Sequence, residues 1–84
     1  MTQYRPIDCS AYDYLEIACM DRYRVDLQLE DGEASGTADG LETRAGQEFL
    51  RITAHAGTEL IRIDRIRRMT VLSRPSRFAS HDFR

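Results

Sequence analysis

Three acidic side chains near the start of the chain are the groups whose types and spacing could do chemistry. Asp8, Asp13 and Glu16 lie within nine residues of one another. Carboxylates grouped in this way can hold a divalent metal ion or act as general acid and base. Both roles need neighbouring groups that remove the carboxylates from water, and the sequence offers none. We interpret Asp13 as support for a helix start and Glu16 as a solvated charge, and either can also contact a partner.

The cysteines and histidines do not show metal-ligand spacing. Cys9 and Cys19 are ten positions apart, and His55 and His81 lie far from both. A helix between the two cysteines would separate them by about 15 Å, beyond the reach of a disulfide. We therefore predict reduced thiols, with Cys19 as a small buried side chain, and no metal or cofactor. His55 is interpreted as a surface histidine, and the chain is predicted not to be an enzyme.

A short helix must position these acidic residues. Pro6 favours an extended lead-in, and Ser10 is a suitable N-cap with Asp13 three positions later, so we predict a helix over about residues 11–20. Helical spacing predicts an inward face of Ala11, Leu15, Ala18 and Cys19. The outward face is predicted to carry Tyr12, Asp13, Glu16 and Met20. An acidic and aromatic surface on a rigid helix suits protein binding and is a poor surface for phosphates.

Five short strands are predicted after the helix. The clearest covers residues 23–29, where apolar and polar residues alternate strictly. Its inward face is predicted to carry Tyr23, Val25, Leu27 and Leu29. Asp31-Gly32 predicts a hairpin because glycine accepts a positive φ, and Gly36 in the returning strand predicts a bulge or bend. The other strands are predicted at residues 33–41, 48–54, 59–63 and 66–72.

One helix followed by closely spaced, bent strands is typical of a small barrel. We predict a mainly β fold with one N-terminal α-helix, in the form of a five-stranded, strongly bent Sm-like β-barrel whose closure removes exposed strand edges. The helix would cap one open end. An OB-like barrel is the alternative layout, although its helix usually lies between strands. Residues 1–75 are predicted to form the single domain, and residues 76–84 a flexible tail.

Composition and charge limit the classes of protein to consider. The 84 residues are 42% hydrophobic and 31% charged, which is ordinary for a soluble domain. No apolar run approaches the roughly 20 residues of a membrane span, and no signal peptide is recognisable, so we predict a cytoplasmic protein. Residues 1–48 carry 11 acids and 4 arginines, whereas residues 49–84 carry 3 acids and 8 arginines. This asymmetry can place an acidic surface on one side of the fold.

The N-terminal residues resemble a known family. The motif is Tyr4-x-Pro-Ile-x-Cys9-x-x-Tyr12-Asp13-x-Leu15-Glu16-x-Ala18-Cys19. It resembles the start of the Rho-binding antiterminator family (Rof), small bacterial inhibitors of the transcription terminator Rho. The likeness continues through Leu27-x-Leu29-x-Asp31-Gly32-Glu33 and Ile61-Arg-Ile-Asp64-Arg-Ile66. It therefore covers roughly residues 4–75, and it implies the same Sm-like fold.

The resemblance also implies a function and a partner. It implies binding to the N-terminal RNA-binding region of the Rho hexamer, which would block loading of the transcript and suppress Rho-dependent termination. A basic groove that holds phosphates also attracts carboxylates, so an acidic helix can mimic RNA and compete with it. The free protein is expected to be monomeric. The residues predicted to contact Rho are Tyr12, Asp13, Glu16, Asp8, Tyr14, Arg44 and Gln47. Tyr14 and Ser10-Ala11 depart from the family pattern, which can shift the contact toward Tyr14.

RNA binding by the C-terminal strands is the main alternative. Sm-like barrels commonly bind RNA, and the basic segment contains Arg62, Arg65, Arg67 and Arg68. Strand alternation places Arg65 and Arg67 on one face and Arg68 on the other, so these side chains are not expected to form one dense patch. Ile61-Arg62-Ile63 also lacks the glycine of the Ile-Arg-Gly usual in RNA-binding Sm proteins. We predict no direct nucleic-acid binding, and a structural adaptor for an unrelated partner is the third hypothesis.

Overall fold

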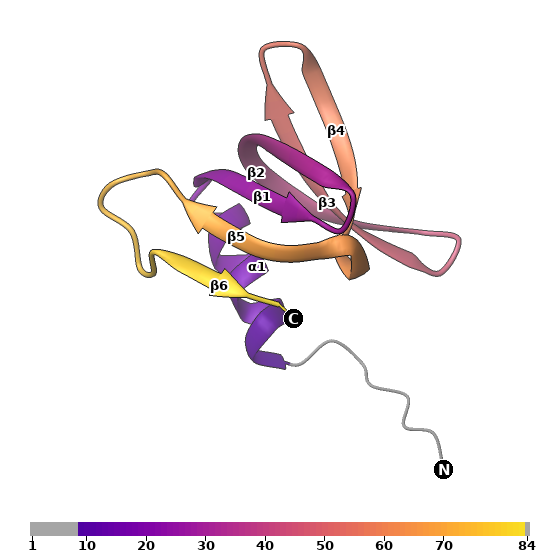
Figure 1. Ribbon diagram of the computed structural model, residues 1–84, viewed down its shortest axis with the longest axis horizontal. Helices are drawn as coiled ribbons and strands as arrows, with labels where there is room; N and C mark the ends of the chain where they lie inside the picture. Colours follow the sequence, from indigo (N-terminus) through magenta and orange to yellow (C-terminus); the bar gives the residue numbers. More distant parts are fainter. Residues whose placement is uncertain (1–8, 84) are drawn as a thin grey trace.

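Alternating apolar and polar residues after the helix produce one bent antiparallel sheet (Figure 1). The computed structural model describes residues 9–83, with side chains from residue 11 onward. The helix is α1 (Cys9–Met20). The strands are β1 (Arg24–Leu29), β2 (Gly32–Arg44), β3 (Gln47–Ala54), β4 (Gly57–Arg62), β5 (Ile66–Val71) and β6 (Ser80–Asp82). Their spatial order is β4-β3-β2-β1-β5-β6, and a 3₁₀ turn, η1 (Ile63–Arg65), joins β4 to β5.

The helix confirms the predicted inward face. Leu15 and Ala18 are fully buried and Ala11 is 8% exposed, so i, i+3 and i+4 spacing places them against the sheet. The helix begins at Cys9, two residues earlier than predicted, so Ser10 lies within it and not before it as an N-cap. Its end at Met20 agrees with the prediction. No helix in residues 9–83 is long and apolar enough to cross a membrane.

A Schellman motif ends the helix and directs the chain into β1. The N–H of Tyr23 donates to the carbonyl of Ala18 at 2.9 Å, and the N–H of Arg22 donates to the carbonyl of Cys19 at 3.2 Å. Arg22 has a φ of 52°, in the left-handed region that glycine usually occupies at this position. The lack of glycine explains why the sequence carries no clear signal for this cap.

The core lies between α1 and the inner face of the sheet. Apolar residues of β1 alternate as predicted, with Val25 and Leu27 almost fully buried and Leu29 half-buried. The remaining strands and η1 contribute Ala38, Leu50, Ile52, Ile61, Ile63, Ile66, Met69 and Val71. The helix and strands therefore share one continuous core.

The length of β2 allows it to serve two neighbours. Residues 32–37 pair with β1, and residues from Thr37 onward pair with β3. The register with β3 shifts between Ala38 and Gly40, which places a bulge at Asp39, three positions after the predicted site at Gly36. Gly36 has a different role: a Cβ there would lie 2.8 Å from the carbonyl oxygen of Thr53. The glycine therefore permits close contact between β2 and β3.

The predicted hairpin is present, but glycine does not explain it. Leu29 pairs with Gly32, so Glu30 and Asp31 form the turn between β1 and β2. Among the described residues, the glycines with positive φ are Gly46 and Gly57, in later turns. The hairpin position is therefore correct, whereas the proposed reason for it is wrong.

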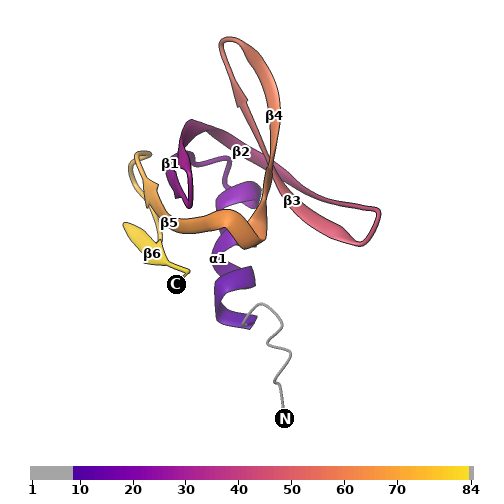
Figure 2. The ribbon, with the colours of Figure 1, turned by 45° about the vertical axis from the view of Figure 1, so that its right-hand side comes forward.

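The structure corrects the strand count and the predicted closure. Residues Ser80–Asp82, which fall in the predicted tail, form β6 and pair with β5 at Arg68, Met69 and Thr70. Within residues 9–83 the sheet keeps two edges, β4 and β6, so the predicted barrel is matched only approximately, without hydrogen-bonded closure. Figure 2 shows α1 beside the strongly bent sheet, and the prediction of a mainly β fold with one helix is confirmed.

Candidate functional site

The outward side of α1 presents exposed carboxylates. Asp13 and Glu16 are exposed, and neither forms an ion pair with another residue of the described chain. Met20 is 71% exposed and follows Glu16 on the next turn of the same face. Because no arginine of the described chain neutralises them, both carboxylates are accessible to a partner.

Tyr12 and Glu48 extend this acidic surface onto the sheet. Tyr12 is half-buried and packs against the core. Burial, followed by the negative charges of Glu48 and Glu16, raises the pKa of Tyr12 above its usual value. Glu48 is an exposed residue of β3, opposite Thr43 of β2. We define the acidic surface as Tyr12, Asp13, Glu16 and Glu48.

Glu48 is the member that the sequence does not identify. It follows Gln47 directly in β3, but the sequence predicts contacts on the helix, its lead-in and the connection at residues 44–47, and not further along this strand. Only the fold brings β3 close enough for its charge to influence Tyr12. The position of Glu48 beside Tyr12 can be predicted only when the way in which α1 crosses the sheet is known.

A second group of acids nearby is neutralised within the chain. Arg51 donates from Nε to Asp39 Oδ1 at 2.6 Å and from Nη1 to Glu42 Oε2 at 2.8 Å. The Thr53 hydroxyl donates to Asp39 Oδ2 at 2.6 Å. The hydrogen bonds from Thr53 and Arg51 lower the pKa of Asp39, and the bond from Arg51 lowers that of Glu42. These carboxylates hold the bulge of β2 and are not free for a partner.

Cys19, near the end of α1, packs partly buried against the core and contacts the Gly40 backbone of β2. It is a free, half-buried thiol. Burial raises the pKa of Cys19 to about 11, although a hydrogen bond from the Gly40 backbone opposes the shift. The thiol is therefore neutral near pH 7. Among the side chains that the structure describes, no group of three or more histidines, cysteines or acids could hold a metal ion.

The structure separates Tyr14 from the acidic surface. Two positions along a helix differ by about 200°, so Tyr14 and Glu16 point to opposite sides of α1. Tyr14 stacks on His81 with ring centroids 4.1 Å apart, and meets Phe78 edge-on at 4.8 Å. This half-buried tyrosine belongs to an aromatic cluster within the chain. Asp8 lies outside the described residues.

Arg44 and Gln47 flank the tight turn between β2 and β3. Ala45 and Gly46 form the turn with φ values of 50° and 79°, the pattern of a two-residue hairpin turn. Both flanking residues are exposed, and Arg44 forms an ion pair with Glu42 at 3.0 Å. The turn projects from the body of the sheet in Figures 1 and 2. Its connection to the acidic surface is Glu48, one residue beyond Gln47.

Most arginines of the C-terminal half are paired with acids of the same chain. The ion pairs join Arg62 with Asp64, Arg65 with Asp31, Arg68 with Asp82, and Arg77 with Asp21. The pairs of Arg62 and Arg68 have N–O distances of 2.8 and 2.7 Å. The predicted basic segment therefore presents much less positive charge than its composition suggests.

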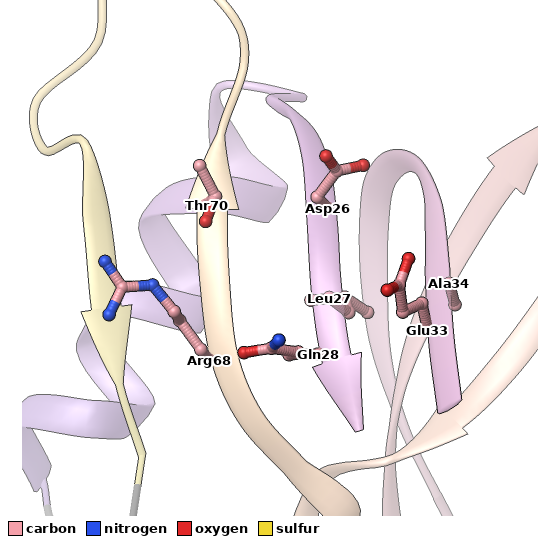
Figure 3. Close-up of a pocket in the computed structure, with 7 residues that line it drawn as sticks. All are labelled: Asp26, Leu27, Gln28, Glu33, Ala34, Arg68 and Thr70. Carbon is pink, nitrogen blue, oxygen red and sulfur yellow. The ribbon is translucent and has the colours of Figure 1, made fainter. Parts of the chain in front are cut away.

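The outer face of the sheet has a polar hollow, and its lining also carries more negative than positive charge. It has a volume of about 260 Å³ and lies across β1, β2 and β5 (Figure 3). Its lining residues are Asp26, Leu27, Gln28, Glu33, Ala34, Arg68 and Thr70. The guanidinium group of Arg68 points toward β6, where it meets Asp82. The hollow therefore presents two carboxylates and does not resemble a phosphate site.

Comparison with known proteins identifies the family. The sequence model of the family described as "Modulator of Rho-dependent transcription termination (ROF)" matches residues 6–83. This chain belongs to the Rof family. Proteins named "Protein rof" from Escherichia coli (strain K12) and Shigella flexneri are each 39% identical to it over 64 residues, which cover 75% of this chain and 76% of each relative.

A solved structure supports the same assignment. The structure titled "YaeO bound to Magnesium from Vibrio cholerae O395" superposes with a TM-score of 0.79 at 25% identity, covering 99% of this chain and 100% of that one. The resemblance to the Rof family drawn from the N-terminal motif is thus confirmed. Rof family members are modulators of Rho-dependent termination, a regulatory role.

Proposed function

We propose that this Rof family protein inhibits Rho by occupying its RNA-binding N-terminal region with the acidic surface. RNA could then not load onto Rho, and transcription would continue through Rho-dependent terminators. Membership of a family of Rho-dependent termination modulators supports the choice of partner. Bacterial transcripts are made in the cytoplasm, so the protein would act there.

The observation that carries this proposal is the exposure of Asp13 and Glu16 without a partner in the described chain. A groove that tracks the phosphate backbone of RNA is lined by arginine and lysine, which attract carboxylates through the same electrostatics. Both acids lie on one helix, so their relative positions are fixed before binding and little ordering is needed. Tyr12 adds an aromatic ring with a polar tip next to these charges.

The remaining predicted contacts are proposed to surround Asp13 and Glu16. Glu48 adds a third carboxylate beside Tyr12. Arg44 and Gln47 form the edge of the proposed contact, and Asp8 would extend it along the chain before α1. Tyr14 is assigned to internal packing because its ring already lies against His81 and Phe78.

The same structure gives little support to direct RNA binding. Five arginines of the C-terminal half, Arg51 among them, already form ion pairs with acids of the chain. The outer hollow of the sheet presents Asp26 and Glu33, which would repel phosphates. Binding to Rho as a protein partner is therefore the function that the charge distribution favours.

Displacement of RNA from Rho tests the proposal directly. Labelled single-stranded RNA is bound to Rho, and its release is followed by fluorescence anisotropy as the protein is added. We expect wild-type protein to release the RNA and to increase read-through in a Rho-dependent termination assay. The double variant Asp13→Asn/Glu16→Gln should lose both effects, because it removes the two charges and keeps the side-chain shapes.

A matched control tests whether the loss of RNA displacement comes from the acidic surface itself or only from the change in net charge. Asp26→Asn/Glu33→Gln removes the same charge from exposed positions on the outer face of the sheet. This control should displace RNA as wild type does. The proposal fails if wild-type protein leaves RNA on Rho, and the location of the contact is wrong if both double variants behave alike.

A further inference from the structure

Residues 77–83, which we call the C-terminal strap, lie along α1 and cover its side opposite Glu16. Figures 1 and 2 both show β6 beside the helix. His81 stacks on Tyr14 at an interplanar angle of 24°, and Phe78 meets the same ring edge-on. Phe83 in turn packs edge-on against His81, with centroids 4.7 Å apart. Tyr14 is therefore enclosed by rings from the other end of the chain.

Polar contacts fix the strap at the end of the helix as well. The backbone N–H of Arg77 donates to the Tyr23 hydroxyl at 2.7 Å. The guanidinium group of Arg77 pairs with Asp21 at 3.2 Å. Asp21 and Tyr23 directly follow α1, so the strap contacts both the helix and the segment that leaves it.

The sheet provides the rigid support for these contacts. His81 pairs with Met69 of β5, and the Val71 N–H donates to the Ala79 carbonyl at 2.7 Å. Arg68 of β5 also pairs with Asp82. The strap therefore connects α1 to β5. The strand against which α1 itself mainly packs is β2.

The helix needs such support because its buried face is small. Among residues 11–20, the buried side chains are those of Ala11, Leu15 and Ala18, and only Leu15 is large; Ile17 is half-buried. A helix of 12 residues is marginal in water without tertiary contacts. The half-buried Tyr14 adds much of the remaining aromatic area, and this area is covered by the strap.

We propose that the C-terminal strap is a positioning element for α1, in which His81 and Phe78 act through Tyr14 to hold the orientation that presents Asp13 and Glu16. This inference rests on the proposed function for its effect on binding. Tyr14 and the strap rings are positioning residues and do not contact Rho. Loss of one ring pair changes an equilibrium by about two- to tenfold. When α1 leaves the sheet more often, the fraction of molecules able to bind falls, and apparent affinity falls with it.

Amide hydrogen exchange and Rho affinity, measured on the same variants, test the inference. In His81→Ala and Phe78→Ala we expect α1 amides to exchange about two- to tenfold faster, while β2 and β3 amides keep their protection. Affinity for Rho should fall in proportion to the fraction of molecules in which α1 stays on the sheet, as given by the exchange measurement. His81→Phe should restore both values because it keeps a flat ring against Tyr14.

Ile61→Val is the matched control for a general loss of stability. Ile61 is a buried residue of β4, at the sheet edge remote in strand order from β6. This variant should lower overall stability without selectively increasing exchange in α1 or weakening Rho binding.

Two results would overturn the inference. Unchanged α1 exchange in both ring variants would show that the strap does not hold the helix. A Rho affinity that does not follow the docked fraction of α1 across the variants would show that the position of the helix does not control binding. Failure of the proposed function is recognised separately, because wild-type protein would then not bind Rho while the exchange measurement would still report on the strap.

Discussion

The outward side of α1 and the arginine-bearing strands β4 and β5 carry opposite charges, and only those of the strands are largely paired within the chain. Asp13 and Glu16 are left without ion pairs in the described chain, whereas Arg62 and Arg68 pair with nearby acids. Exposed pairs add little to stability, but they neutralise charge that would otherwise attract a ligand. Composition alone therefore overstates the basic surface of these strands, whereas both acids of the helix stay available to a partner.

The largest expected effect comes from reversing charge in each region. Asp13→Lys/Glu16→Lys should weaken Rho binding by on the order of 100-fold or more, because each lysine would face cationic groups in the proposed interface. Arg62→Glu/Arg68→Glu should change affinity by less than about threefold, since those arginines are outside it. Isothermal titration of both variants with Rho measures the difference. Equal losses in the two variants would remove the distinction between the regions.

A smaller effect separates acids that stabilise the fold from acids that are free to bind. Asp39→Asn should lower the free energy of unfolding by about 1–2 kcal/mol, because it disrupts hydrogen bonds from Arg51 and Thr53. Asp13→Asn should change it by less than about 0.5 kcal/mol. Urea unfolding at pH 7 measures both values. A cost at Asp13 as large as that at Asp39 would mean that the helix acid has a structural role.

The pH dependence of stability should show that the charge of Asp39 stabilises the fold. The pKa of Asp39 is lowered in the folded protein, so the unfolded chain binds the proton more readily. Its stabilising contribution is complete above the ordinary aspartate pKa of about 3.9 and is lost as pH falls through the lower folded value. The stability gap between wild type and Asp39→Asn should therefore narrow below about pH 4. A gap that stays constant between pH 7 and pH 3 would contradict the assignment.

The smallest effect is expected from the arginine pairs. Arg62→Ala should leave the stability of the fold almost unchanged, because the exposed pair with Asp64 is screened by solvent. Arg67→Ala provides the comparison, since Arg67 is exposed and forms no ion pair with the described residues. Thermal melts of the two variants should nearly coincide. A much larger loss for Arg62→Ala would show that its pair contributes substantially to the fold.

Local patterns predict the parts of the fold that depend on local contacts. Strict alternation identifies β1, and helical spacing identifies Leu15 and Ala18 as the inward face of α1. The N-terminal motif is sufficient to predict the family. These features depend on neighbours within a few positions, so the sequence displays them directly.

The remaining features depend on contacts between distant residues. A strand of three residues such as β6 is too short to show periodicity. The role of Tyr14 depends on His81 and Phe78, and the neutralisation of Arg65 depends on Asp31. Likewise, Glu48 joins the acidic surface only because β3 passes near Tyr12. No local pattern contains this information.

The position of the strap in the sequence affects when α1 becomes firmly held during synthesis. A ribosome delivers α1 early and the strap late, and the hydrogen bond from Arg77 to Tyr23 joins residues 54 positions apart. A nascent chain that has not yet emerged to Phe83 holds its helix without the rings that enclose Tyr14. On the proposal above, Asp13 and Glu16 would be presented by a less firmly held helix until the strap has been made.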